Sequence, residues 1–295
     1  MSGTDKFQLF VYDGDFGLPS FDVECSKSIL YTIIAQVPVQ KKLLNSIKNC
    51  AFYNGPCFVH KNVKFNTFHE IVLYLKTLNY DLDKDLSPKQ RSESFAITNL
   101  VDSKLKPVTE FVFYTDQRNY HEFTKVWYFK ALPMPFNQIH ASRIQRRAED
   151  LIESLYPNDV NMEVVKDYIN VVARECLSSL STRLGTSMYF FGNTPTTLDV
   201  VVYSYISPLL KLPLPANSIP SLVSLWPNLC DFVKRIDNNY FSDLPKEPKY
   251  IKNETQNKNS DDEISYVAIS LLTFSAMSLV VGFAISRGFI SSNFM

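Results

Sequence analysis

The stretch that most constrains the fold runs from Phe191 to Ile206 and reads "FGNTPTTLDVVVYSYI". Within it, Thr196 and Asp199 stand three residues apart, which is the spacing of a capping box at the start of a helix. In that arrangement the hydroxyl accepts an early backbone N–H, and the carboxylate accepts the N–H of the cap residue. A run of apolar residues follows immediately. The pattern therefore predicts an apolar helix that begins at Thr196.

An aromatic residue, a glycine and a proline lead into this capping box in the order aromatic–Gly–x–x–Pro. The lead, the box and the apolar run together resemble the C-terminal domain of the glutathione transferases. The resemblance implies an all-α domain that follows a thioredoxin-like domain. It also raises the question of whether this chain has kept glutathione chemistry or only the fold.

Residues 81–245 support the all-α part of this interpretation. They contain helical patterns, and they lack an alternating run long enough for a second sheet. The helical segments read "ESFAITNLVDSKLKPVTEFVFY", "ASRIQRRAEDLIESL", "MEVVKDYINVVARECLSSLSTRL" and "LDVVVYSYISPLL". We therefore expect a helical domain over residues 81–245.

Residues 1–80 read as an α/β domain. Strands are predicted at "FQLFVYD", at "VPVQKKLL" and, as a pair joined by a turn at Lys61–Asn62, at "CFVHKNVKFN". Helices are predicted from a cap at Asp22 to about Gln36 and from about Thr67 to Leu78. This βαβ-then-ββα order is that of a thioredoxin-like domain. Pro56 stands just before the third strand, where such folds hold a cis proline, so we expect a cis bond there.

Composition excludes several functional classes. Lys and Arg together number 30, as do Asp and Glu, so the sequence offers no global charge that would favour nucleic acid. The five cysteines have no short paired spacings, and the four histidines form no metal-ligand motif. We expect no disulfide framework, no metal and no cofactor.

The end of the sequence differs from the rest. Residues 264–286 pass without a single charged residue or histidine, and 23 residues in a helix span roughly 35 Å, enough to cross a bilayer. A buried core helix is the alternative. We expect a transmembrane tail anchor whose apolar residues include Ile264, Leu271, Leu272, Phe274, Val280, Phe283 and Ile285.

This anchor would leave the bulk of the chain in the cytosol, because only nine residues follow Ser286. The moderate hydrophobicity and the trailing Arg287 favour the mitochondrial outer membrane. Residues 246–263 are polar and are expected to form a flexible linker. No secretory signal or transit peptide is recognisable at the N-terminus.

The residues that a glutathione transferase needs are not evident. Ser20 is the one well-placed hydroxyl, and Cys25 would lie one turn into the first helix, but a helix-entry serine and a buried cysteine are the commoner roles. At the start of the third helix, Thr67 and Phe68 stand where an acid or amide and a serine would hold the γ-glutamyl group. Losing that charge-assisted pair removes about 2–5 kcal/mol of binding. An apolar plug such as Phe16 or Phe68 would close the pocket altogether.

Residues 114–137 read "YTDQRNYHEFTKVWYFKALPMPFN" and carry a more specific resemblance. They are similar to the metaxins, outer-membrane relatives of the glutathione transferases, through an aromatic–x–Asp start, Asn-Tyr, a spaced Thr, Trp-Tyr and a proline-rich turn. "FGLPSFDVEC" near the start also fits. The turn departs slightly, because "MPF" stands where the family more often reads Phe-Pro-Leu. With the expected anchor, the chain is identified as a member of the metaxin family, of the tail-anchored metaxin-1 type.

This resemblance implies a non-enzymatic subunit of the sorting and assembly machinery for outer-membrane β-barrel proteins. It implies a heterodimer with a metaxin-2-like subunit beside the β-barrel assembly core protein. Two other functions stay open: an adaptor that links mitochondria to motor-adaptor proteins for transport, and a membrane-tethered glutathione transferase. Sequence alone does not separate them.

Two sets of residues have open roles. The first set lies on a predicted helical stretch and comprises Tyr114, Asp116, Asn119, Tyr120, Trp127 and Tyr128. Its aromatic residues form either the seam between the two domains or a surface that binds a partner. Asp116 and Asn119 are expected to cap or brace the helix. The other set, Arg143, Arg146 and Arg147, faces either anionic lipid headgroups or an acidic partner, or forms a solvated helix face.

Overall fold

The computed structural model describes residues 6–157, 161–216 and 218–251. A four-stranded sheet forms the N-terminal part, with the strand order β2-β1-β3-β4. β1 (Phe7–Val11) pairs in parallel with β2 (Val39–Leu43) and antiparallel with β3 (Cys57–His60), which pairs antiparallel with β4 (Val63–Phe65). The inner strands β1 and β3 are largely buried, whereas β4 at one edge is mostly exposed.

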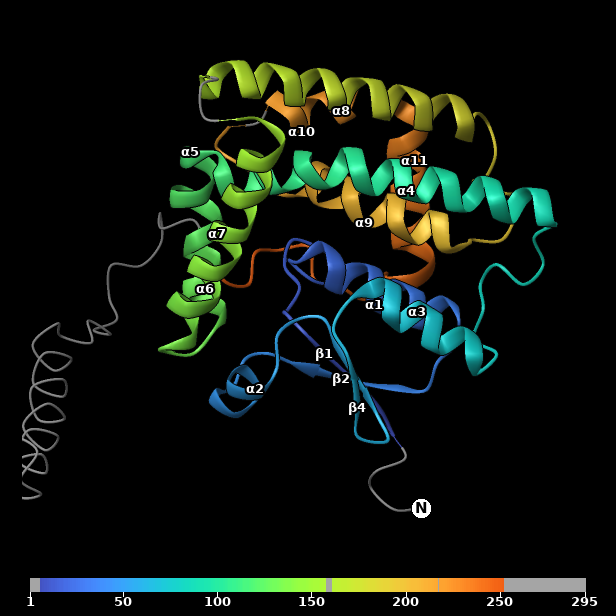
Figure 1. Cartoon of the computed structure of the whole chain (residues 1–295), viewed down its shortest axis with the longest axis horizontal. Helices are drawn as coiled ribbons and strands as arrows, with labels where there is room; N and C mark the ends of the chain where they lie inside the picture. Colours follow the sequence, from blue (N-terminus) through green and yellow to red (C-terminus); the bar gives the residue numbers. More distant parts are fainter. Residues whose placement is uncertain (1–5, 158–160, 217, 252–295) are drawn as a thin grey trace, which may run out of the picture. The chain divides into compact units, whose positions relative to one another are not determined.

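Helices α1 (Val23–Ile34) and α3 (Phe68–Thr77) pack together beside this sheet, between it and the helical part of the chain (Figure 1). Asp22 caps α1 by accepting the backbone N–H of Cys25. Thr67 and Glu70 form a capping box at the start of α3. The sheet and these two helices give the α/β thioredoxin-like arrangement, and the Gly55–Pro56 bond ahead of β3 is cis.

The C-terminal part is helical. It comprises α4 (Pro88–Glu110), α6 (Lys125–Ala131), α7 (Phe136–Leu155), α8 (Met162–Leu184), α9 (Thr197–Lys211), α10 (Ser218–Val223) and α11 (Pro227–Tyr240). Helix α9 lies at its centre and contacts α4, α1, α10 and α11. The two parts share one continuous hydrophobic core and form one compact unit.

The capping box at the start of α9 explains why this helix can be buried. Asp199 accepts the backbone N–H groups of Phe190 (3.0 Å) and Thr196 (2.8 Å) and the Thr196 hydroxyl (2.7 Å). Phe190, Thr196 and Asp199 are all buried, so water cannot take the place of the carboxylate as the acceptor for these donors. The local signal in the sequence therefore fixes the start of the central helix.

Three features differ from the sequence-based expectations. The stretch from Tyr114 to Tyr128 is not one regular helix, because Asp116 is extended and interrupts it, giving π-helical turns at Phe111–Thr115 (η1) and Tyr120–Thr124 (η2) around the short α5 (Gln117–Asn119). A short helix, α2 (Ile47–Phe52), stands where none was predicted.

The third difference concerns the polar stretch that was expected to begin as a linker at residue 246. Residues 249 and 250 are instead held against the body of the protein. Lys249 and Tyr250 donate backbone N–H groups to Asp15, and the Tyr250 hydroxyl donates to Asp13 at 2.6 Å. Residues 249 and 250 are therefore packed onto the compact unit of the chain.

Within the described residues, no helix is long and apolar enough to cross a membrane. The expected anchor at residues 264–286, with Ile264, Leu271, Leu272, Phe274, Val280, Phe283 and Ile285, lies outside the described residues.

The Asp199→Asn variant tests the role of the capping box. The NH2 group of the asparagine would face groups that are themselves donors, the backbone N–H of Phe190 or of Thr196 and the Thr196 hydroxyl. One or two buried donors would then lack an acceptor. We expect the free energy of unfolding to fall by about 2–4 kcal/mol, measured by urea unfolding of the full-length chain in mild detergent. Asp231→Asn is the matched control, because Asp231 is exposed and, within the described part of the chain, forms its ion pair with the exposed Lys234. Equal, small effects of both variants would contradict the prediction.

Candidate functional site

The candidate site is the seam where α1, the cis-proline loop and the start of α3 meet the helical part, because a glutathione transferase binds its substrate there. Ser20, the expected hydroxyl, is buried in this seam. Its Oγ donates to the Tyr12 carbonyl at 2.9 Å and accepts the Asp22 N–H at 3.3 Å. Ser20 therefore braces the entry to α1 and presents no free hydroxyl to a ligand.

Cys25 lies in the first turn of α1 and is fully buried. A Cβ atom added to Gly55 would lie only 2.7 Å from the Cys25 sulfur and 3.0 Å from the Tyr12 ring. The cis-proline loop thus rests directly on the start of α1, with no space between them for a substrate thiol. Burial raises the pKa of the Cys25 thiol well above its ordinary value, so the sulfur stays protonated and unreactive.

Tyr12 occupies the position directly after β1, and its role was missed in the sequence. Its hydroxyl forms a 2.7 Å hydrogen bond with Nδ1 of His140 on α7. Burial raises the pKa of Tyr12 well above its ordinary value, the opposite of what a phenol needs to activate a thiol. The place of Tyr12 at the end of the first predicted strand was the available signal, but nothing in the sequence pointed to His140 as its partner.

The start of α3 offers no γ-glutamyl site. Phe68 is buried against Tyr31, with the two ring centroids 5.9 Å apart. The Glu70 carboxylate accepts the N–H groups of Asn66 and Thr67, at 3.1 and 3.2 Å. A carboxylate of the chain itself therefore takes donors that could otherwise bind an anionic ligand.

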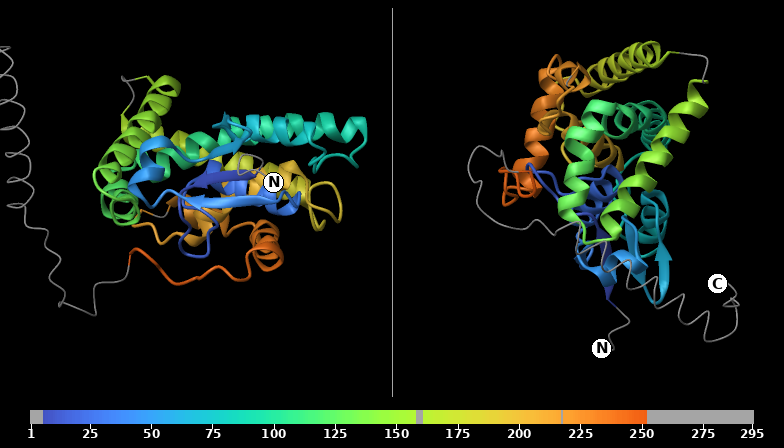
Figure 2. Two further views of the ribbon diagram at one scale, coloured as in Figure 1. Left: turned by 90° about the horizontal axis from the view of Figure 1, so that it is seen from below. Right: turned by 90° about the vertical axis from the view of Figure 1, so that its left-hand side faces the viewer.

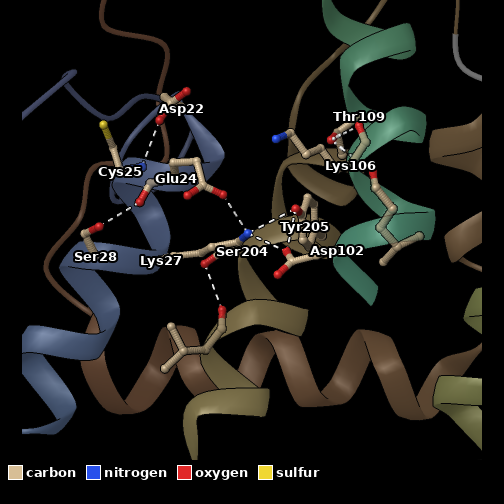
Figure 3. A network of polar contacts seen from close by, with 12 residues as sticks. Asp22, Glu24, Cys25, Lys27, Ser28, Asp102, Lys106, Thr109, Ser204 and Tyr205 are labelled. Atoms are coloured by element: carbon tan, nitrogen blue, oxygen red, sulfur yellow. Dashed lines mark hydrogen bonds and ion pairs between the residues drawn. The ribbon is translucent and has the colours of Figure 1, made fainter. Parts of the chain in front are cut away.

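Lys27 fills the middle of the seam (Figure 3). Its side chain is 2% exposed, and its Nζ donates to Glu24 (2.7 Å), to Asp102 on α4 (2.8 Å) and to the Tyr205 hydroxyl on α9 (3.0 Å). The ammonium also lies 4.2 Å from the centroid of the Tyr205 ring. One side chain therefore joins α1 to both central helices, and sequence spacing gave no sign of it.

A small cavity adjoins this network. Its volume is about 40 Å³, and it is lined among others by Asp22, Glu110, Tyr114 and Arg147. Ligand pockets typically measure roughly 300–1,000 Å³, so the cavity has room for a few water molecules and not for a tripeptide. The Glu110 Oε2 atom is buried there without a hydrogen-bond partner among the described residues, while Oε1 lies 3.4 Å from Arg147.

A larger groove of about 320 Å³ lies elsewhere, beside α1, β2 and the end of α11. Its lining is mainly apolar and includes Ile33, Val39 and Phe241. None of Ser20, Cys25, Pro56 and Phe68 lines it. This apolar groove is therefore separate from the residues expected to carry glutathione chemistry.

The metaxin-like aromatic residues lie inside the chain. Tyr114, Tyr120, Trp127 and Tyr128 are buried, and the Trp127 ring stacks on Phe21 at 4.1 Å. These rings pack between the loop after β1, helix α6 and the π-helical turns. Little of their surface is therefore exposed to a partner.

Their polar neighbours brace the same region. Asn119 is buried and exchanges hydrogen bonds with the backbone of Ala216, at 2.7 and 3.0 Å. Asp116 accepts the N–H of Asn119 and so caps α5. The turns around Asp116 are therefore fixed to the loop after α9.

Asp15 also joins distant parts of the chain through hydrogen bonds, and nothing in the sequence predicted this. Its carboxylate accepts the Trp127 indole N–H at 2.9 Å and the backbone N–H of Lys249 at 2.7 Å. The neighbouring Phe16 is half-buried against Phe123, with ring centroids 5.7 Å apart. The loop after β1 is thus held by α6 on one side and by the end of the described chain on the other.

Comparison with solved structures shows the class of fold. A glutathione S-transferase of Ceriporiopsis subvermispora, solved in complex with glutathione, matches with a TM-score of 0.55 at 10% identity, over 82% of this chain and 99% of that chain. A glutathione transferase of Phanerochaete chrysosporium matches with a TM-score of 0.53 at 13% identity, over 82% of this chain and all of that chain. The chain has a glutathione-transferase-like fold with an α/β N-terminal part and a helical C-terminal part.

Sequence comparison is more specific. A family model described as outer mitochondrial membrane transport complex protein matches residues 25–145, and a glutathione S-transferase C-terminal domain model matches residues 173–236. The chain is 31% identical to the metaxin-1 homolog of Drosophila melanogaster, over 79% of this chain and 72% of that protein. It is 29% identical to metaxin-1 of Macaca fascicularis, over 96% of this chain and 91% of that protein. The chain belongs to the metaxin family, as the sequence indicated.

The unpartnered Glu110 oxygen predicts a pH dependence. Burial raises the pKa of Glu110 from its ordinary 4.5 to about 6. Between pH 4.5 and pH 6 the Glu110 carboxyl is therefore protonated in the folded state and ionised in the unfolded state. The stability that this group contributes is full below pH 4.5 and is lost as the pH rises to about 6, a difference of about 2 kcal/mol.

The Glu110→Gln variant should therefore equal the wild type in stability at pH 4 and exceed it at pH 7.5 by up to about 2 kcal/mol. Urea unfolding of the full-length chain across this pH range measures the difference. Glu175→Gln, at an exposed site on α8, should show no such trend. A Gln variant that is less stable than the wild type at pH 7.5 would mean that the Arg147 ion pair outweighs burial.

Proposed function

We propose that this chain is a non-catalytic subunit of a transport complex of the mitochondrial outer membrane. The observation that carries the proposal is that the chain's own side chains fill the seam in which a glutathione transferase holds its substrate. Cys25 lies against the cis-proline loop, Phe68 is buried at the start of α3 and Lys27 bridges α1, α4 and α9. A protein that keeps this fold while closing this site is suited to binding other proteins.

The membrane attachment is part of the proposal. We assign residues 264–286 as a membrane anchor, on the strength of 23 consecutive residues without charge. Residues 6–251 would then face the cytosol. The description of the matching family model, an outer mitochondrial membrane transport complex protein, supports this location.

The finer role that we propose is assistance in the import and insertion of β-barrel proteins by the sorting and assembly machinery. The partners would be a metaxin-2-like subunit, as a heterodimer, and the β-barrel assembly core protein. Membership of the metaxin family supports this choice. Its test is affinity purification of the tagged full-length chain from gently solubilised mitochondria. Recovery of the barrel-assembly components supports the proposal, and recovery of motor adaptors alone would replace it with a transport role.

The Cys25→Ala variant separates binding from catalysis. Because the proposed function uses no nucleophile, we expect the variant to support insertion of a radiolabelled β-barrel precursor into isolated mitochondria at the wild-type rate. Cys176→Ala is the matched control, since Cys176 is a buried cysteine on α8, remote from the seam. Loss of insertion with Cys25→Ala alone, at unchanged protein abundance, would point to a reactive thiol and contradict the proposal.

A further inference from the structure

Some of the exposed apolar side chains lie on neighbouring elements at one corner of the molecule. The α2–α7 corner is defined here as α2, the end of α6, the turn that follows it and the first half of α7, which lie together in both views (Figures 1 and 2). A hydrogen bond of 2.9 Å from Arg143 on α7 to Asn54 beside α2 joins its two sides. Five large apolar side chains in it are between 39% and 69% exposed: Ile47, Phe52, Phe129, Met134 and Ile139.

Positive charge surrounds these apolar side chains. The exposed basic residues of the corner are Lys48, Lys130, Arg143 and Arg146. Among the described residues, no carboxylate forms an ion pair with any of the four. An open hollow of about 520 Å³ on α7 is lined by Ile139, Ser142, three arginines (Arg143, Arg146 and Arg147) and one acidic residue, Asp150. The corner therefore combines exposed apolar groups with an excess of positive charge.

The described chain ends close to this corner. The Tyr250 ring packs edge-on against Trp127 of α6, with centroids 5.5 Å apart, and Lys249 and Tyr250 are tied to Asp13 and Asp15. Figure 2 shows the last described segment running to the side of the molecule that carries α6 and α7. Twelve residues, 252–263, separate this point from the assigned anchor. Twelve residues span at most about 40 Å even when fully extended, so this side of the protein stays near the bilayer.

We propose that the α2–α7 corner docks on the anionic surface of the membrane that holds the chain's own tail. The apolar side chains would enter the headgroup region, and the four basic residues would contact lipid phosphates. This inference rests on the proposed membrane anchor. The charge of the corner favours lipid over a second copy of this chain, because two such corners facing each other would bring like charges together.

Docking orients the whole protein. A single membrane contact, through the anchor, does not set which surface of the protein faces the bilayer, whereas a second contact fixes which surface faces away from it. Helix α8 lies at the far side of the helical part from α2 (Figure 1) and would point into the cytosol. The corner would then act as the second of two membrane contacts, which is what stable peripheral attachment generally requires.

The test is hydrogen–deuterium exchange of the full-length chain in vesicles of phosphatidylcholine, with and without about one-fifth phosphatidylinositol. We expect the amides of residues 45–54 and 129–143 to exchange several-fold more slowly in the anionic vesicles, while those of α8 are unchanged. In the Arg143→Gln/Arg146→Gln variant, the loss of two charges should weaken docking by about thirtyfold and abolish the protection. Phe52→Ser should also reduce it. Lys89→Gln/Arg174→Gln, on α4 and α8, is the control and should behave as the wild type.

The outcomes distinguish docking from anchoring. Flotation of the chain with neutral vesicles reports the anchor alone, and a chain that fails to float would refute the assigned anchor. Exchange that is identical in neutral and anionic vesicles overturns the docking inference, whether or not the chain floats. Protection of the same segments in detergent that grows with protein concentration also overturns it, because it would identify a second copy as the occupant.

Discussion

The buried ammonium of Lys27 is the interaction on which the seam depends. A charge with 2% exposure is costly to desolvate, and it is tolerated here because two carboxylates, a phenol oxygen and an aromatic ring surround it. These partners come from α1, α4 and α9, so the charge is satisfied only when the sheet part and the helical part are docked. Opening the seam to admit a ligand would leave the ammonium without part of this shell. The network therefore keeps the sheet part and the helical part closed against each other at the seam.

The remaining contacts of the seam follow from this closure. Once α1 is fixed against the helices, Tyr12 meets His140 and the cis-proline loop rests on Cys25. Asp15 performs a similar role on the other side, where it connects Trp127 with the end of the described chain. Tyr12 and Cys25 are the groups placed to act on a thiol, and both are buried side chains that pack the seam. Burial raises the pKa of each, so both side chains are neutral.

Local signals in the sequence predicted much of the fold. The capping box at Thr196, the helix cap at Asp22 and the Lys61–Asn62 turn are short-range patterns, and the structure has each of them. The contacts of the seam join residues far apart in the chain: Tyr12 meets His140 across 128 positions, and Lys27 meets Tyr205 across 178. No spacing rule encodes such pairs. The break at Asp116 was also missed, because aromatic residues on both sides of it, such as Phe113 and Tyr120, keep helical spacing and only the extended backbone of this one residue interrupts the helix.

The central claim is that this metaxin keeps the glutathione-transferase fold with its substrate site closed. Titration calorimetry of the full-length chain with glutathione, up to about 10 mM and beside an active glutathione transferase, tests it most directly. The account predicts no saturable heat for this chain, because Cys25, Phe68 and Lys27 occupy the seam. Saturable binding at micromolar to low-millimolar affinity, abolished by a bulky substitution such as Gly55→Phe in the cis-proline loop, would contradict it.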